Sequence, residues 1–155
     1  MKKFMAAAGL MCCVSLSYAD ESIYRGMGNA KGEFPGLKQL QAQGLIGKKP
    51  EVSRYDYNDV YKVKKPFQFL GQKVVLVSDE YMSKYVGCCV SEGWGAVFAK
   101  TGDLKPLQQY AKKHQCNLGE IDQDTEDYYN FRFKSLPRAQ YYELSCRERD
   151  LNTEE

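Results

Sequence analysis

Alternating apolar and polar positions predict short β-strands through most of the chain. Tyr55 and Tyr57 alternate with polar neighbours, and Val60 to Val63 extends this strand. Later alternation around Leu70-Gly71-Gln72 predicts a hairpin between residues 66–70 and 72–78. Beyond it, Ser78 either caps a helical turn through Tyr81 and Tyr85 or lies in a continuing strand. An apolar run predicts a further strand at residues 94–99.

The C-terminal part has the clearest alternation and predicts a hairpin. Residues 129–134 place Tyr129, Phe131 and Phe133 on one face, and residues 136–139 form a proline turn. The returning strand places Tyr142, Leu144 and Cys146 on its apolar face. Positive charge is then expected on the outer face and turn of this hairpin, at Arg132, Lys134, Arg138, Arg147 and Arg149.

One helix is predicted at residues 104–114, because Leu104, Leu107, Tyr110, Ala111 and His114 form one apolar stripe. Asp103 precedes it as an N-cap, and Pro106 lies in its first turn. A shorter helix is predicted between Pro35 and Gly44. Strands with one main helix indicate an α+β fold with a mostly antiparallel sheet of hairpins.

The N-terminus has the three regions of a cleavable signal peptide at residues 1–19. Lys2 and Lys3 precede an apolar stretch from Phe4 to Leu16, and Ser17-Tyr18-Ala19 is a small-residue cleavage site. The stretch is too short for a stable membrane span. We therefore expect a periplasmic or secreted protein, with one globular domain at residues 20–149 and a flexible tail at 150–155.

Composition narrows the classes of function. The 155 residues are 43% hydrophobic and 27% charged, as in an ordinary globular protein. Loss of the two signal-peptide lysines leaves the mature chain with as many basic residues as its 20 acidic ones. A nucleic-acid-binding protein usually has a basic surplus, so we do not expect a nucleic-acid partner.

Four cysteines remain in the mature chain: Cys88, Cys89, Cys116 and Cys146. An even number in an exported protein indicates disulfide bonds. A bond between the adjacent Cys88 and Cys89 would be strained, so we expect each to bond separately to Cys116 or Cys146. The alternative is a redox-active Cys88-Cys89 pair.

Residues with catalytic or metal-binding chemistry are few. His114 is the only histidine and lies on the apolar side of its predicted helix, where packing or capping is expected. Asp122, Asp124 and Glu126 resemble the start of a calcium loop, but the glycine and glutamate that complete an EF-hand are missing. Gly93-Trp94-Gly95 is too short for a phosphate-binding loop. We expect no cofactor and no metal, although carboxylate-based hydrolysis and calcium binding stay open as alternatives.

Tyrosines are abundant and offer a large rigid face with a polar tip, as binding surfaces do. The candidate surface comprises Tyr55, Tyr57, Tyr61, Tyr81 and Tyr85. These features favour a small non-enzymatic binding module of the bacterial envelope, inhibitor-like or immunity-like, that contacts another envelope or secreted protein. The alternative is a thiol-redox or hydrolytic enzyme.

Overall fold

The structure is a computed structural model and describes residues 23–82, 90–124 and 127–151. The predicted signal segment at residues 1–19 lies outside these ranges. Seven strands form the main sheet: β3 (Val52–Tyr55), β4 (Asn58–Lys62), β5 (Gln68–Phe69), β6 (Gln72–Glu80), β7 (Gly93–Ala99), β8 (Asn117–Ile121) and β11 (Tyr141–Arg147). The other elements are β1 (Met27–Gly28), β2 (Phe34–Pro35), α1 (Leu37–Ala42), α2 (Lys105–Lys113), β9 (Asp127–Tyr128), β10 (Phe131–Arg132), η1 (Phe133–Ser135) and η2 (Glu148–Asp150).

The main sheet is antiparallel, with the strand order β3-β4-β6-β7-β11-β8 and with β5 paired to β6. The main helix, α2, lies within the predicted range 104–114 and buries Leu107, Tyr110 and Ala111. The α+β class and the mostly antiparallel sheet are therefore confirmed. Of the two alternatives after Ser78, the continuing strand is correct, because β6 runs without interruption to Glu80.

The predicted C-terminal hairpin is wrong. Strand β11 lies between β7 and β8, with Tyr141 opposite both Ala99 and Ile121. Residues 127–132 instead form the small β9–β10 pair, because Tyr129 and Asn130 both take positive φ and reverse the chain in a two-residue turn. Residues 141–147 pair with β7 on one side and β8 on the other, so β11 is an inner strand of the sheet and does not pair with β10.

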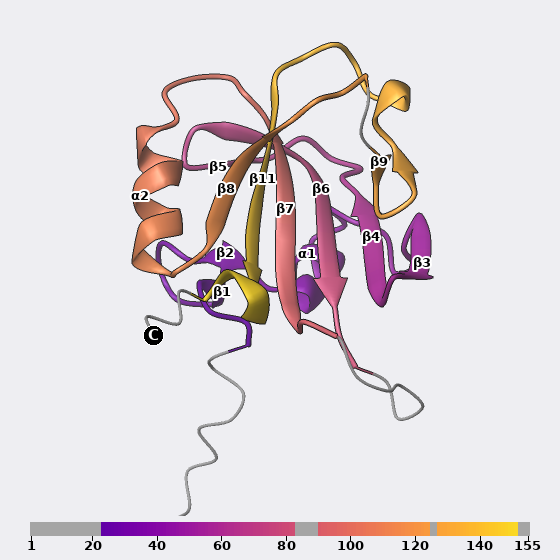
Figure 1. Ribbon diagram of the computed structural model, residues 1–155, viewed down its shortest axis with the longest axis horizontal. Coiled ribbons are helices and arrows are strands. Elements are labelled where there is room, and N and C mark those ends of the chain that lie inside the picture. Colours follow the sequence, from indigo (N-terminus) through magenta and orange to yellow (C-terminus); the bar gives the residue numbers. More distant parts are fainter. Residues whose placement is uncertain (1–22, 83–89, 125–126, 152–155) are drawn as a thin grey trace, which may run out of the picture.

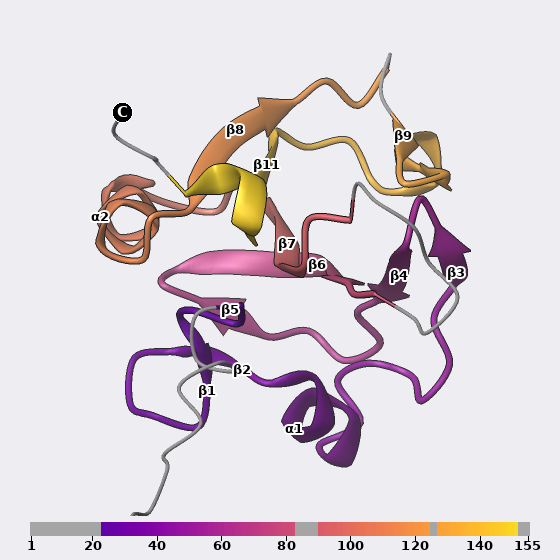
Figure 2. The same cartoon turned by 60° about the horizontal axis from the view of Figure 1, so that its bottom comes forward.

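The sheet is covered on both faces (Figures 1 and 2). The N-terminal segment with β1, β2 and α1 packs on one face, and the β9–β10 segment covers the other. Helix α2 lies along the β8 end of the sheet. Among the described residues, no helix has the length and apolar character needed to cross a membrane.

The core under the N-terminal segment is built on aromatic side chains. Phe34 stacks on Trp94 with 4.7 Å between the ring centroids, and both rings are fully buried. Arg25 joins this segment to distant parts of the chain: it donates to the carbonyl oxygens of His114, Gln115 and Arg147 at 2.7–2.8 Å. The start of the described chain is thereby fastened to the end of α2 and to the last strand.

One disulfide bond joins two neighbouring strands. Cys116, just before β8, bonds to Cys146 on β11, with 4.4 Å between the Cα atoms. The expectation that each of them bonds to Cys88 or Cys89 is therefore wrong. The register explains the observed pairing: Ser145 lies opposite Asn117, so the next residues along the two strands face each other. Cys88 and Cys89 lie outside the described residues.

The described chain continues past Arg149. Asp150 belongs to η2, and its carboxylate accepts hydrogen bonds from the Ser145 hydroxyl at 2.6 Å and the Arg147 amide at 2.8 Å. The sequence pattern placed Asp150 in the tail. Residues 152–155 lie outside the described residues.

Candidate functional site

A buried arginine is the centre of a polar cluster on the sheet face that β9 and β10 cover. The Arg147 side chain is fully buried; its Nε lies 3.0 Å from Glu80 Oε2 and its Nη1 lies 3.1 Å from Glu143 Oε1. Further hydrogen bonds join the guanidinium to the side chains of Asn58, Ser78, Ser145 and Tyr128. The expected exposed position of Arg147 is wrong, because β11 is a central strand and both of its faces are covered.

Two glycines on β7 make room for this side chain. In the sheet, Glu80 and Arg147 lie on either side of Gly93, and Gly95 occupies the next row on the same face. A Cβ atom on Gly95 would lie 2.8 Å from Arg147 Nη1. The guanidinium therefore crosses β7 where that strand has no side chains, which explains the Gly-Trp-Gly sequence in structural terms.

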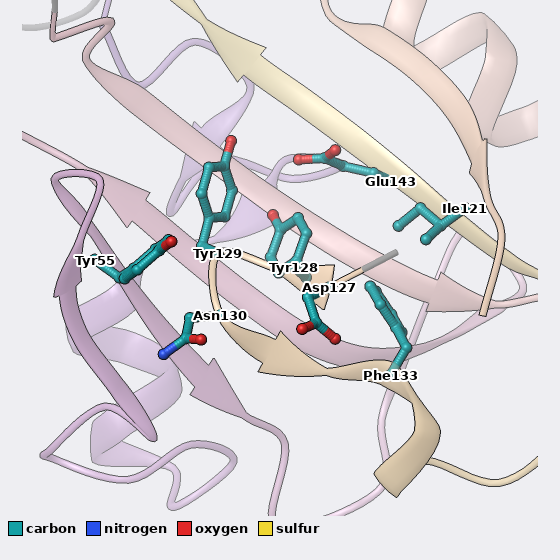
Figure 3. Close-up of a pocket in the computed structure, with 8 residues that line it drawn as sticks. All are labelled: Tyr55, Ile121, Asp127, Tyr128, Tyr129, Asn130, Phe133 and Glu143. Atoms are coloured by element: carbon teal, nitrogen blue, oxygen red, sulfur yellow. The ribbon is translucent and has the colours of Figure 1, made fainter. Parts of the chain in front are cut away.

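A pocket of about 390 Å³ lies next to this cluster (Figure 3). We call it the tyrosine pocket; it is lined by Tyr55, Ile121, Asp127, Tyr128, Tyr129, Asn130, Phe133 and Glu143. The Glu143 carboxylate points toward the rings of Tyr128 and Tyr129, and its bond to Arg147 holds it there. Burial raises the pKa of the Tyr128 phenol, which stays protonated and hydrogen-bonds Ser78 at 2.7 Å.

Tight turns with strained backbones flank the pocket. The β3–β4 turn has positive φ at Asp56 and Tyr57, and the β9–β10 turn has positive φ at Tyr129 and Asn130. Arg54, just before the first turn, also has positive φ. Such backbone costs non-glycine residues about 1–2 kcal/mol each, and strained residues concentrate at functional sites.

The five tyrosines of the candidate surface do not form one surface. Tyr55 faces the tyrosine pocket and is 52% exposed. Tyr57 and Tyr81 are half-buried and both lie beside the Arg54 guanidinium, which is 4.0 Å from the centre of the Tyr81 ring. Tyr61 is buried on the opposite sheet face from Tyr55, and Tyr85 lies outside the described residues. The alternation that suggested a shared face is broken by the β3–β4 turn and the shift in register before it.

A second and larger hollow, of about 940 Å³, lies on the face that carries the N-terminal segment. We call it the N-terminal cleft. Residues 24–29, helix α1 and the strands β4 and β6 form it, and its lining includes Tyr24, Met27, Leu37, Gln39, Tyr61 and Asp79. Burial and the neighbouring carboxylates Asp59 and Asp79 raise the pKa of Tyr61 to about 12, so this phenol is protonated at neutral pH.

Asp79 is the acidic group of this cleft. Its Oδ1 accepts a hydrogen bond from the Tyr24 hydroxyl at 2.8 Å, and across the strand pair it lies directly opposite Asp59. Asp59 is itself well satisfied by Ser53, the Arg54 amide and Tyr81. Burial raises the pKa of Asp79, and the Asp59 charge acts in the same direction.

Replacing Asp79 with asparagine is expected to raise the free energy of unfolding at pH 7 by up to about 1 kcal/mol, because two like charges no longer face each other. The pKa of Asp79 is higher in the folded chain than in the unfolded chain. The ionised carboxylate therefore lowers the free energy of unfolding at pH values above the folded pKa, and this loss disappears as the pH falls below it. Urea unfolding of both proteins between pH 3 and pH 8 (roughly the range around an ordinary aspartate pKa) measures this. A constant difference across the range would contradict the assignment.

The other candidates for chemistry have structural surroundings. His114 ends α2 and its ring lies 4.4 Å from the Tyr110 ring, and burial lowers its pKa, in keeping with the expected packing role. In the acidic loop, Asp124 pairs with Arg138 at 2.8 Å, and Glu126 lies outside the described residues. No group of three or more potential metal-ligating side chains gathers within residues 23–82, 90–124 and 127–151.

Sequence reasoning missed the Arg147 cluster and Asp79. Two signals pointed to them: glycines in an otherwise apolar strand, which mark a close approach of other groups, and the polar Ser78-Asp79-Glu80 run at the end of a β-branched strand. Comparison with known proteins adds no function to this geometry, because no protein-family model, no curated protein and no solved structure matches the chain.

Proposed function

We propose that the protein is a non-enzymatic binding module exported to the bacterial envelope, where it contacts another envelope or secreted protein as an inhibitor or immunity protein does. One observation carries the proposal: Tyr55 exposes 52% of its surface at the end of the edge strand β3, beside the tyrosine pocket. An exposed aromatic side chain next to a pocket is the usual anchor of a protein interface.

The surroundings of Tyr55 support this role. Met82 is 51% exposed, and the hydrogen bond from the Tyr81 amide to the Tyr57 carbonyl places it beside the same β3–β4 turn. Tyr55 and Met82 are the two large hydrophobic residues that stay exposed in the described part of the chain, and their place beside one turn supports a contact site there. Tyr129 occupies a left-handed position where asparagine or glycine would cost less, which favours a role for its ring at the pocket.

The proposed location has its own support. The signal-like segment at residues 1–19 predicts export, and a disulfide bond between Cys116 and Cys146 is typical of oxidising compartments. A partner in the same compartment follows from these two features.

Replacing Tyr55 with alanine is expected to weaken partner binding by about 30-fold, the effect of removing an interface hot spot. The mature protein first captures partners from a bacterial envelope extract, and the dissociation constant of the purified complex is then measured by calorimetry. Tyr142→Ala is the matched control, because Tyr142 is half-buried on the opposite face of β11 and should bind as the wild type does.

Two outcomes contradict the proposal. If the mature protein retains no partner at modest salt, it is not a binding module of this kind. If a partner is retained with equal affinity by the Tyr55 and Tyr142 variants, the interface lies elsewhere.

A further inference from the structure

The N-terminal cleft contains a carboxylate, Asp79, that the charges of Arg147 and Arg54 reach only from a distance, without an ion pair in the described part of the chain. Among the described residues, no arginine or lysine forms an ion pair with Asp79, which accepts its one hydrogen bond from a neutral phenol. Lys38 lines the same cleft, but it is exposed and forms no such pair. A partly buried carboxylate is stabilised most by a cation that hydrogen-bonds to it.

A second acceptor lies in the lining of the same cleft. The side-chain oxygen of Gln39, on α1, is buried and accepts no hydrogen bond from the described residues. Buried acceptors without a partner are rare in folded proteins. Gln39 and Asp79 together therefore favour a ligand that donates hydrogen bonds and carries positive charge.

The walls of the cleft favour an organic cation over a metal ion. Tyr24, Met27, Leu37 and Tyr61 supply aromatic and aliphatic surface, which suits a hydrocarbon chain and the cation–π contacts of an ammonium group. A calcium ion needs about six to eight oxygen ligands. Among the residues that line the cleft, Asp79 supplies the one carboxylate.

We propose that the N-terminal cleft binds an organic cation, an ammonium or guanidinium group that donates hydrogen bonds to the Asp79 carboxylate while its hydrocarbon part lies against Tyr61 and Leu37. The site is on the opposite sheet face from the tyrosine pocket, so it is separate from the partner surface proposed above. The same chemistry is offered by a free amine and by a lysine or arginine side chain of a peptide.

The test is a titration of the mature protein, followed by NMR at the signals of Met27, Leu37 and Tyr61. The probes are 1,4-diaminobutane, N-acetyl-lysine amide and N-acetyl-arginine amide, with N-acetyl-norleucine amide as the uncharged match and calcium chloride as the metal. We expect the charged organic probes to shift these signals and norleucine amide to leave them unchanged. Binding of the diamine alone identifies a free amine as the ligand, and binding of the amino-acid amides alone identifies a side chain.

Asp79→Asn keeps the shape of the side chain and an acceptor for Tyr24, and it is expected to weaken probe binding by about 10- to 100-fold. Asp124→Asn, an exposed carboxylate outside the cleft, should bind the probes as the wild type does. Far-UV circular dichroism checks that both variants fold. The proposal is overturned if no charged probe binds at millimolar concentration, if norleucine amide binds equally well, if Asp79→Asn binds unchanged, or if calcium alone binds through Asp79.

Discussion

Replacing Arg147 with methionine is expected to lower the free energy of unfolding by about 3–5 kcal/mol, which is a large part of the stability of a small domain. The substitution fills similar space but removes the guanidinium that faces Glu80 and Glu143. Glu80 is only 5% exposed and is left with a single, half-exposed arginine, Arg149. Urea unfolding at pH 7, followed by tryptophan fluorescence, measures the loss.

Two further variants separate the buried charge from general disruption. Arg149→Met removes the exposed partner of Glu80 and should cost about 1 kcal/mol or less. Combining Arg147→Met with Glu80→Gln removes both buried charges, so the double variant should be more stable than Arg147→Met alone. If the free energy of unfolding of Arg147→Met lies within about 1 kcal/mol of the wild-type value, which is the cost of losing an exposed ion pair, Arg147 is not held as described.

Removing the disulfide bond is expected to cost about 3–4 kcal/mol. The bond joins residues 30 positions apart, and the free energy follows from the conformational freedom that a loop of this size loses in the unfolded chain. The variant Cys116→Ala with Cys146→Ala tests this by urea unfolding without any reducing agent.

The matched measurement is the wild type with and without reductant. Mass spectrometry after alkylation should show that Cys116 and Cys146 are blocked before reduction and modified after it. A double variant that is as stable as the oxidised wild type would contradict a structural bond. Modification of both thiols without reduction would show that the bond is not formed in the isolated protein.

Local elements could be predicted from the sequence because their causes are local. The stripe of Leu107, Tyr110 and Ala111 has the helical period, and α2 buries these three side chains. The run from Trp94 to Phe98 is apolar on both faces, and β7 is buried throughout. In both cases the pattern alone determines which residues avoid water.

Long-range arrangement could not be predicted in the same way. The position of β11 depends on which strands lie beside it, and alternation is identical for an edge strand and a central strand. The burial of Arg147 depends on that position. A shift in the register between Val74 and Leu76 also changes which residues of β6 share a face, and no local pattern predicts it.

The candidate site was predictable only in part. Tyr55 was proposed as a binding residue and is exposed beside a pocket, whereas Tyr61 was placed on the same surface and is buried on the other face. Asp79 gained its unusual surroundings from the pairing of β4 with β6, which brings Asp59 opposite it. Such pairings join residues that are distant in the sequence, so spacing along the chain does not reveal them.

The position of β11 has a consequence for the timing of folding. The last strand of the described residues is an inner strand of the sheet, so a nascent polypeptide that lacks residues 141–147 leaves β8 without its neighbour and β7 with one side open. Contacts between such distant segments also make folding slow. The central part of the sheet therefore cannot close before residues 141–147 have been synthesised, and until then the edges of β7 and β8 that pair with β11 stay open to other strands.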